Sequence, residues 1–218
     1  MAIEQLDEYE QGEQVRKWLR QNGSSLITGV ALGLACIFGW QWWQGQGSRH
    51  RDEAATQYQS LTDAINAKDN SKVEALSSAF DSKYSDTGFS ALATLRHVQY
   101  LQANGDTAKA IALLKAKAGS VKDPVMAELF ALRESRLWLI AGKPDEALKR
   151  VASISDSNFP EVLGELRGDI QMARGQRDEA RKSYQQALTH LDQAAPTRDL
   201  LEMKLIDAGG QPPAKPEA

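Results

Sequence analysis

The longest uninterrupted apolar stretch of this chain lies near its beginning, at Ser24–Trp43, and residues 21–48 contain no charged side chain. A helix over this stretch would be about 30 Å long, which is the hydrocarbon thickness of a bilayer, and it would satisfy its backbone hydrogen bonds internally. Trp40, Trp42 and Trp43 gather at one end, where amphipathic aromatic side chains favour the headgroup region. The pattern therefore predicts a transmembrane helix at 24–43, preceded by a tail at 1–23.

A cleaved signal peptide and a buried core helix are the alternatives to a membrane anchor. A signal peptide has a shorter leading region, a shorter apolar run and small residues at its cleavage site. In this chain 23 residues precede the apolar run, and no Ala-x-Ala-like site follows it. We therefore expect an uncleaved single-pass anchor in contact with membrane lipid.

The distribution of basic residues bears on the orientation of this anchor. Arg16, Lys17 and Arg20 precede the span, whereas Arg49 and Arg51 follow it. The positive-inside rule thus favours a cytoplasmic N-terminus by a margin of one charge.

A stripe of small residues runs along the predicted span. Small residues four positions apart let another helix approach closely, although such residues are also common in membrane helices generally. The candidate helix-contact residues are Gly29, Gly33, Ala35 and Gly39.

The rest of the chain follows helical periodicity, and no strand-like alternation is present in the sequence. We expect helices near 50–67, 71–84, 88–104, 106–117, 123–141, 144–153, 160–174, 176–191 and 196–207. The all-α class follows from this pattern.

Three segments repeat the same pattern, a glycine followed five residues later by alanine: Gly105 to Ala110, Gly142 to Ala147, and Gly175 to Ala180. A period of 33 to 37 residues between the glycines, with helical patterning on both sides, is typical of tetratricopeptide-type helix–turn–helix repeats. We therefore expect a tetratricopeptide-like solenoid over 44–208, closed by a capping helix at 196–207. The final segment, 209–218, contains three prolines and is expected to be disordered.

Solenoids present the first helices of successive repeats on a concave face. The repeat register makes this face the candidate partner-binding groove, which either stays open or is covered by an additional helix such as 72–84 or the capping helix. Its candidate residues are Leu92, Leu95, Gln99, Leu129, Leu132, Arg136, Leu139, Val162, Glu165, Asp169 and Met172.

Composition and charge narrow the function without pointing to chemistry. The net charge of −3 does not favour nucleic acid as a partner, and the single cysteine, Cys36, lies inside the apolar run. His50, His97 and His190 share no ligand spacing, so we expect neither a metal site nor a cofactor. No phosphate-binding loop, nucleophile elbow or other catalytic motif is present in the sequence, which favours a non-enzymatic protein.

Several short motifs occur in a characteristic order along the chain. They are Glu13-Gln14-Val15-Arg16-Lys17-Trp18, Asn22-Gly23 before the span, Gly39-Trp40 and Trp43 at its end, Leu166-Arg167-Gly168-Asp169, Gly175, Ala180-Arg181 and Glu202-Met203-Lys204-Leu205. In this order the chain resembles the YfgM family of bacterial inner-membrane proteins, which are ancillary subunits of the SecYEG translocon. The resemblance implies a cytoplasmic N-terminus, a periplasmic repeat domain, and association with SecYEG and with the membrane-anchored periplasmic chaperone PpiD.

Two functions follow as hypotheses. The first is a non-enzymatic adaptor at the SecYEG translocon that links exported polypeptides to periplasmic chaperones such as PpiD. The alternative is a helical-repeat scaffold for envelope protein assembly that self-associates into a homo-oligomer through the small-residue stripe.

Overall fold

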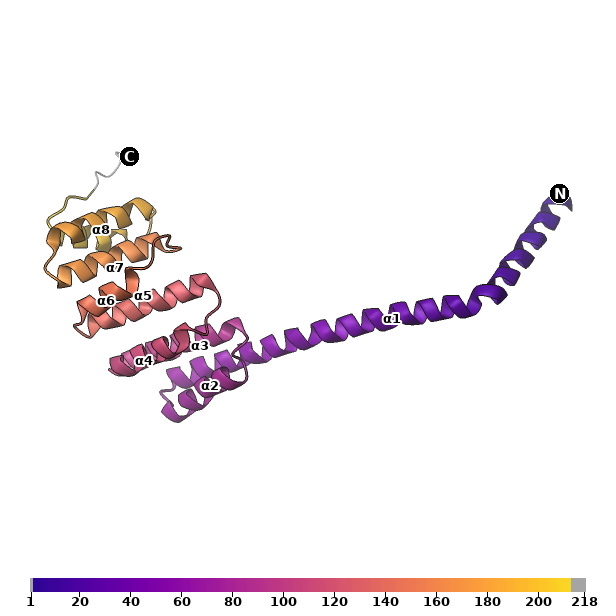
Figure 1. Cartoon of the computed structure of the whole chain (residues 1–218), viewed down its shortest axis with the longest axis horizontal. Coiled ribbons are helices and arrows are strands. Elements are labelled where there is room, and N and C mark those ends of the chain that lie inside the picture. The colour runs from indigo at the N-terminus through magenta and orange to yellow at the C-terminus, as the bar shows by residue number, and fades with distance from the viewer. Residues whose placement is uncertain (1, 213–218) are drawn as a thin grey trace. The chain divides into compact units, whose positions relative to one another are not determined.

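The computed structural model describes residues 2–212 of the chain, with side chains at 16–41 and 48–212 (Figure 1). Every regular element in this part is an α-helix, and none of it forms a strand, which confirms the all-α prediction. The chain divides into two compact units, Met1–Ala55 and Thr56–Ala218. The helices are α1 (Ala2–Asn66), α2 (Asn70–Ser82), α3 (Gly88–Ala103), α4 (Thr107–Ala118), α5 (Pro124–Ile140), α6 (Pro144–Val151), α7 (Pro160–Ala173), α8 (Arg177–His190) and α9 (Arg198–Asp207).

The apolar run lies within α1. Arg16–Gln41 is long and apolar enough to cross a membrane, and none of its most apolar window is buried. The sequence predicted a tail, a span and a separate helix near 50–67, whereas α1 begins at Ala2 and ends at Asn66. No proline interrupts this stretch, and each interior glycine costs a helix only about 1 kcal/mol. The side chains of Trp42 and Trp43, and the part of the predicted tail beyond Pro212, lie outside the described residues.

The second unit is built from helix pairs that turn at the predicted glycines. Gly105, Gly142 and Gly175 have φ values of +83°, +71° and +74°, a region that glycine adopts without steric cost. At each turn the residue after the glycine donates its N–H to a carbonyl five residues earlier, at 2.8–2.9 Å, as from Asp106 to Leu101. This is the Schellman motif that ends many helices. The repeated turn predicted from the sequence is therefore present in all three pairs.

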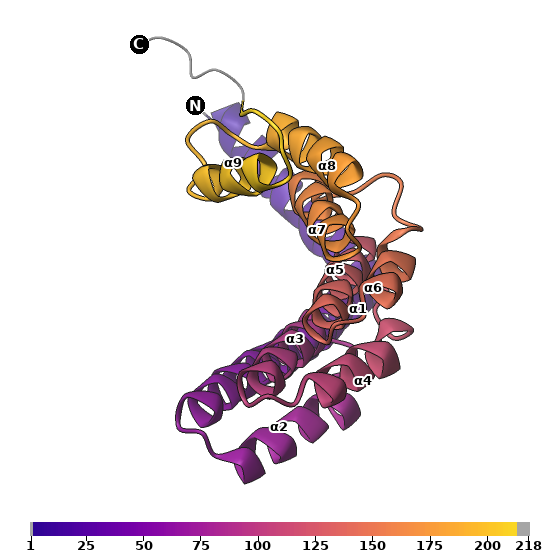
Figure 2. The same cartoon turned by 90° about the vertical axis from the view of Figure 1, so that its left-hand side faces the viewer.

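The first and second helices of the pairs occupy different sides of the second unit. Figure 2 shows α3, α5 and α7 along the inner side of its curve, with α4, α6 and α8 outside them. The alanines of the repeat, Ala110, Ala147 and Ala180, are fully buried where the two helices of each pair meet. Successive apolar clusters then join each pair to the next.

The capping helix α9 ends the unit, as predicted. Leu201, Leu205 and Ala208 pack against Tyr184 and Leu188 of α8 in one apolar cluster. This contact covers the apolar face of α8 that would otherwise have no neighbour.

Candidate functional site

The concave face of the second unit divides into an open part and a covered part. On α3, Leu92 is 40% exposed and Gln99 is exposed, whereas Leu95 is half-buried against the core. On α5, Leu129 and Arg136 are half-buried. Leu92, Gln99, Leu129 and Arg136 thus line the open part of the face, whereas Leu95 packs against the core.

Three of the predicted groove residues belong to the core between α5 and α7. Leu132 is only 4% exposed and sits in a cluster with Leu163 and Leu166. Leu139 and Val162 are half-buried against the same cluster. Rotation of α5 about its axis therefore places Leu132 and Leu139 toward α7 and not toward the groove.

The groove residues of α7 are engaged by the capping helix. Lys204 Nζ of α9 lies 2.6 Å from Glu165 Oε1 and 2.7 Å from Asp169 Oδ2. The Tyr184 hydroxyl donates to the other oxygen of Asp169 at 2.9 Å, and burial, followed by the charge of Asp169, raises the pKa of Tyr184. Met172 packs against the cluster formed by α8 and α9. Thus α9 covers this end of the groove. A groove covered by the capping helix was one of the two alternatives predicted from the sequence.

The open part of α5 carries three residues outside the predicted groove, Val125, Arg133 and Ile140, beside the predicted Leu129 and Arg136. Val125, Leu129, Arg133, Arg136 and Ile140 follow spacings of four, four, three and four, which place them on one face of a helix. This face is opposite Ser135, whose hydroxyl donates to the Ala147 carbonyl of α6 at 2.8 Å. The same spacing, continued from Leu129, was the sequence signal that could have identified Arg133.

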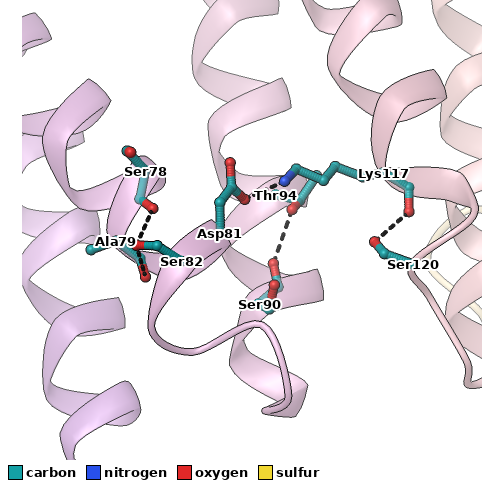
Figure 3. Close-up of polar contacts among 8 residues, drawn as sticks. All are labelled: Ser78, Ala79, Asp81, Ser82, Ser90, Thr94, Lys117 and Ser120. Carbon is teal, nitrogen blue, oxygen red and sulfur yellow. Dashed lines mark hydrogen bonds and ion pairs between the residues drawn. The ribbon is translucent and has the colours of Figure 1, made fainter.

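A pocket of about 380 Å³ opens where α3 and α5 begin, lined by Gly88, Thr94, Lys117 and Phe130 among others. Figure 3 shows the contacts that Thr94, Lys117 and Ser120 of its lining make. Thr94 donates to the Ser90 carbonyl at 2.9 Å, Ser120 donates to the Lys117 carbonyl at 2.8 Å, and Lys117 pairs with Asp81 of α2. The ion pair joins α4 to α2, whereas the two hydrogen bonds are local to α3 and to the end of α4, and a structural role accounts for all three.

A smaller pocket of about 150 Å³ between α2 and α3 contains His97, which is 7% exposed. Its Nε2 atom has no hydrogen-bond partner and lies 3.6 Å from Glu74 Oε1. Burial lowers the pKa of His97, against the opposing effect of the Glu74 and Asp81 carboxylates. His97 is therefore neutral at pH 7.

Neither the histidines nor the carboxylates form a recognisable ligand set. Among the described residues, no group of three or more His, Cys, Asp or Glu side chains could hold a metal ion. His97 lies on α3, and His190 is exposed at the end of α8.

The small-residue stripe of α1 lies on an open surface. A Cβ atom added at Gly29, Gly33 or Gly39 would meet no other atom within 4 Å, and Ala35 is exposed. The stripe is thus accessible to another helix.

Comparison with known proteins agrees with this architecture. The chain is 28% identical over 182 residues, 84% of its length, to a Haemophilus influenzae protein described as an ancillary SecYEG translocon subunit, of which the match covers 89%. It is 25% identical to the Escherichia coli protein of the same description, over 91% of this chain and 95% of that one. A Neisseria gonorrhoeae protein of that description is 27% identical, over 92% and 96% respectively. The resemblance inferred from the sequence motifs is confirmed.

A family model for the tetratricopeptide repeat-like domain matches residues 16–210, which include the apolar part of α1 and the whole series from α2 to α9. Because this match covers most of the chain and the glycine turns and buried alanines take their repeat positions, the chain belongs to the tetratricopeptide repeat-like domain family.

Proposed function

We propose that this chain is a non-enzymatic adaptor of the SecYEG translocon, anchored in the bacterial inner membrane by α1. The observation that carries the proposal is the combination, in one chain, of an exposed apolar helix with a repeat unit whose concave face is partly open. The relatives described as ancillary SecYEG translocon subunits match nearly the full length of the chain, so the match is longer than the repeat unit alone. Repeat solenoids bind partners through such concave surfaces.

In this proposal residues 1–23 are cytoplasmic, 24–43 cross the membrane, and 44–208 form a periplasmic domain. The basic residues Arg16, Lys17 and Arg20 before the span support this orientation. The periplasmic domain would meet exported polypeptides as they emerge and pass them to a chaperone such as PpiD. The open positions Leu92, Gln99, Leu129 and Arg136 would form the contact surface.

Purification from membranes tests the translocon association directly. Tagged full-length chain extracted in mild detergent should carry SecYEG subunits, identified by mass spectrometry. A variant in which Ser24–Trp43 is replaced by an unrelated membrane helix is the control for non-specific membrane contacts. Recovery of no SecYEG subunit with the native chain would refute the association.

Photocrosslinking tests the concave surface. A photoreactive amino acid at Leu92, on the open face of α3, should form adducts with a chaperone or a nascent exported chain in intact cells. The same group at Gln185, exposed on the outer helix α8, is the matched control. Equal adducts from both positions, or none from Leu92, would count against this use of the face.

Membrane orientation is tested by labelling. Cys36 is first replaced by serine, and single cysteines are then introduced at Lys17 and at Gln185, which are both exposed. A membrane-impermeant maleimide should label the Gln185 position in spheroplasts and the Lys17 position only after the membrane is permeabilised. The reverse pattern would overturn the proposed topology.

The second candidate function is self-association as a scaffold for envelope protein assembly. The open surface at Gly29, Gly33 and Gly39 favours it, because a second helix could approach closely there. Gly29→Leu with Gly33→Leu should then abolish homo-oligomers in membranes. An unchanged oligomer would exclude the stripe as the assembly surface.

A further inference from the structure

Three arginines on the open inner helices have no acidic partner among the described residues. Arg96 lies on α3, and Arg133 and Arg136 lie three residues apart on α5. None of them forms an ion pair in the part of the chain that the structure describes. We call these three residues the arginine surface.

All three members of the arginine surface are half-buried. Arg133 is half-buried, and burial followed by the charge of Arg136 lowers the pKa of its guanidinium. The Nε atom of Arg96 is buried without a hydrogen-bond acceptor, although its Nη1 atom donates to Gln99 Oε1 at 3.0 Å. Guanidinium groups stay protonated in proteins, so Arg133 and Arg136 hold two like charges on one face of α5, and the half-buried guanidinium groups are incompletely solvated.

The acidic side chains of α5 are engaged elsewhere. α3 contains no carboxylate. On α5, Glu128 accepts hydrogen bonds from Ser157 and Asn158, and Glu134 pairs with Arg150 at 2.7 Å. At the far end of the groove, Lys204 forms ion pairs with Glu165 and Asp169, as described above. The carboxylates of α5 and two of the three on α7 are thus held by other groups, and the arginine surface has no acidic partner among the described residues.

Apolar side chains border the arginine surface. Leu92 of α3 is 40% exposed, and Val125 and Ile140 of α5 are 38% and 55% exposed. Along α5 the stripe from Val125 to Ile140 is about 22 Å long and carries its two arginines between aliphatic residues. A partner that matches it must carry both carboxylates and aliphatic side chains over a comparable length.

We propose that the arginine surface of α3 and α5 binds an acidic polypeptide segment whose carboxylates are interspersed with aliphatic residues. Charge-assisted hydrogen bonds from guanidinium to carboxylate are about twice as strong as neutral ones, and the partly desolvated setting strengthens them. A small anion would satisfy one arginine and leave the aliphatic positions exposed. A flat membrane surface cannot follow the inner side of the curve on which α3 and α5 lie (Figure 2).

This inference rests on the proposed adaptor function and gives the chemistry of the polypeptide that the groove accepts. In exported chains or chaperones, the recognised segments would be those rich in Asp or Glu next to Leu, Ile or Val. Basic segments of the same length would be poor ligands because the arginines repel them. Uncharged segments would be poor ligands because they offer the arginines no carboxylate.

Binding is measured with the full-length chain in nanodiscs of zwitterionic lipid. The probes are fluorescent peptides of one length in which leucine alternates with glutamate, glutamine or lysine, and the readout is fluorescence anisotropy. The glutamate peptide should bind at least about tenfold more tightly than the other two, and added salt should weaken its binding.

Two double variants test the residues. R133Q/R136Q should bind the glutamate peptide about tenfold more weakly, whereas R133K/R136K should retain part of the affinity. R177Q/K182Q removes two exposed charges from the outer helix α8 and should bind like the native chain. R133Q/R136Q should melt no lower than the native chain, because it removes a repulsion, so lost binding will not reflect lost folding.

The outcomes separate this inference from the proposed function. If the native chain copurifies with SecYEG but prefers no peptide, or if R177Q/K182Q weakens binding as much as R133Q/R136Q does, the arginine surface is not the site. If R133Q/R136Q instead loses binding only to vesicles that contain phosphatidylglycerol, the surface recognises anionic lipid and the inference fails. If peptide selectivity holds but SecYEG is absent from the purified complex, the proposed function fails and the acidic-peptide site stands.

Discussion

Replacing Gly168 with alanine puts a methyl group into space that the ring of Tyr184 occupies. A Cβ atom built at Gly168 lies 2.2 Å from Tyr184 Cε1 and 2.4 Å from Cδ1. Carbon atoms in contact are normally about 3.5–4.0 Å apart, so the ring or α7 must move by more than about 1 Å. Tyr184 is buried and bonded to Asp169, and it packs beside α9, so the ring has no open space to enter.

The magnitude follows from opposing effects. Overpacking of this kind costs about 1–3 kcal/mol, and displacing the Tyr184 hydroxyl from the Asp169 carboxylate costs about 1.5–3 kcal/mol. Alanine returns about 1 kcal/mol of helix propensity relative to glycine. We expect Gly168→Ala to destabilise the second unit by about 3 kcal/mol, which lowers its melting temperature by roughly 6–12 °C.

Thermal unfolding of the full chain in detergent, followed by circular dichroism at 222 nm, measures this change. Gly88→Ala is the matched control, because a Cβ there meets nothing within 4 Å, and its melting temperature should stay level or rise. In a Tyr184→Leu background the smaller side chain should make Gly168→Ala nearly neutral. A Gly168→Ala chain as stable as the native one would refute the close packing of α7 against the Tyr184 ring.

Three further predictions concern contacts within the second unit. Ser135→Ala removes the hydrogen bond to the Ala147 carbonyl and should cost about 1 kcal/mol in thermal unfolding, and an unchanged melting temperature would contradict it. Lys204→Met leaves Glu165 and Asp169 without their cation and should cost about 1–2 kcal/mol. Hydrogen exchange should then accelerate in α9 before α3, with Lys204→Arg as the partial rescue, and uniform protection would argue against this role. Burial lowers the pKa of His97, so the unfolded chain binds a proton near pH 6.5 that the folded chain does not. The contribution of neutral His97 to the free energy of unfolding should thus be fully present above pH 6.5 and be lost as the pH falls toward the lower pKa of His97 in the folded chain. In His97→Gln the melting temperature should depend less on pH over this range.

The turns of the repeats could be predicted from the sequence because their signal is local. A glycine at a helix end predicts a left-handed turn, and an alanine five residues later predicts a close helix contact. The turns are found at Gly105, Gly142 and Gly175, and the contacts at the alanines that follow them. The apolar run likewise predicts its own helix, since twenty uncharged residues leave few alternatives. From α2 to α9 the helix ends agree with the predictions to within about three residues, as expected where the ends fray.

The groove was harder to predict because its lining depends on how each helix is rotated against its neighbours. Leu132 and Arg133 are adjacent in sequence, yet Leu132 enters the core with α7 whereas Arg133 joins the open stripe. Apolar character favoured Leu132, whereas the spacing continued from Leu129 favoured Arg133, and the tertiary packing decides between these two faces of α5. The contacts of Lys204 with Glu165 and Asp169 join residues 39 and 35 positions apart, and no local sequence pattern predicts them.

The arrangement of helix pairs has a kinetic consequence. In the second unit, α3, α5 and α7 make most of their contacts with the helices that directly precede or follow them in the sequence. Closing such short loops costs little entropy, so folding can begin at any pair and spread to its neighbours without waiting for distant segments. Every intermediate of this process ends in an uncovered apolar face, such as that of Tyr184 and Leu188 on α8. The ten residues of α9 cover this last face and so end the array with a soluble surface. Without them the array would end in an exposed apolar face to which other chains could bind.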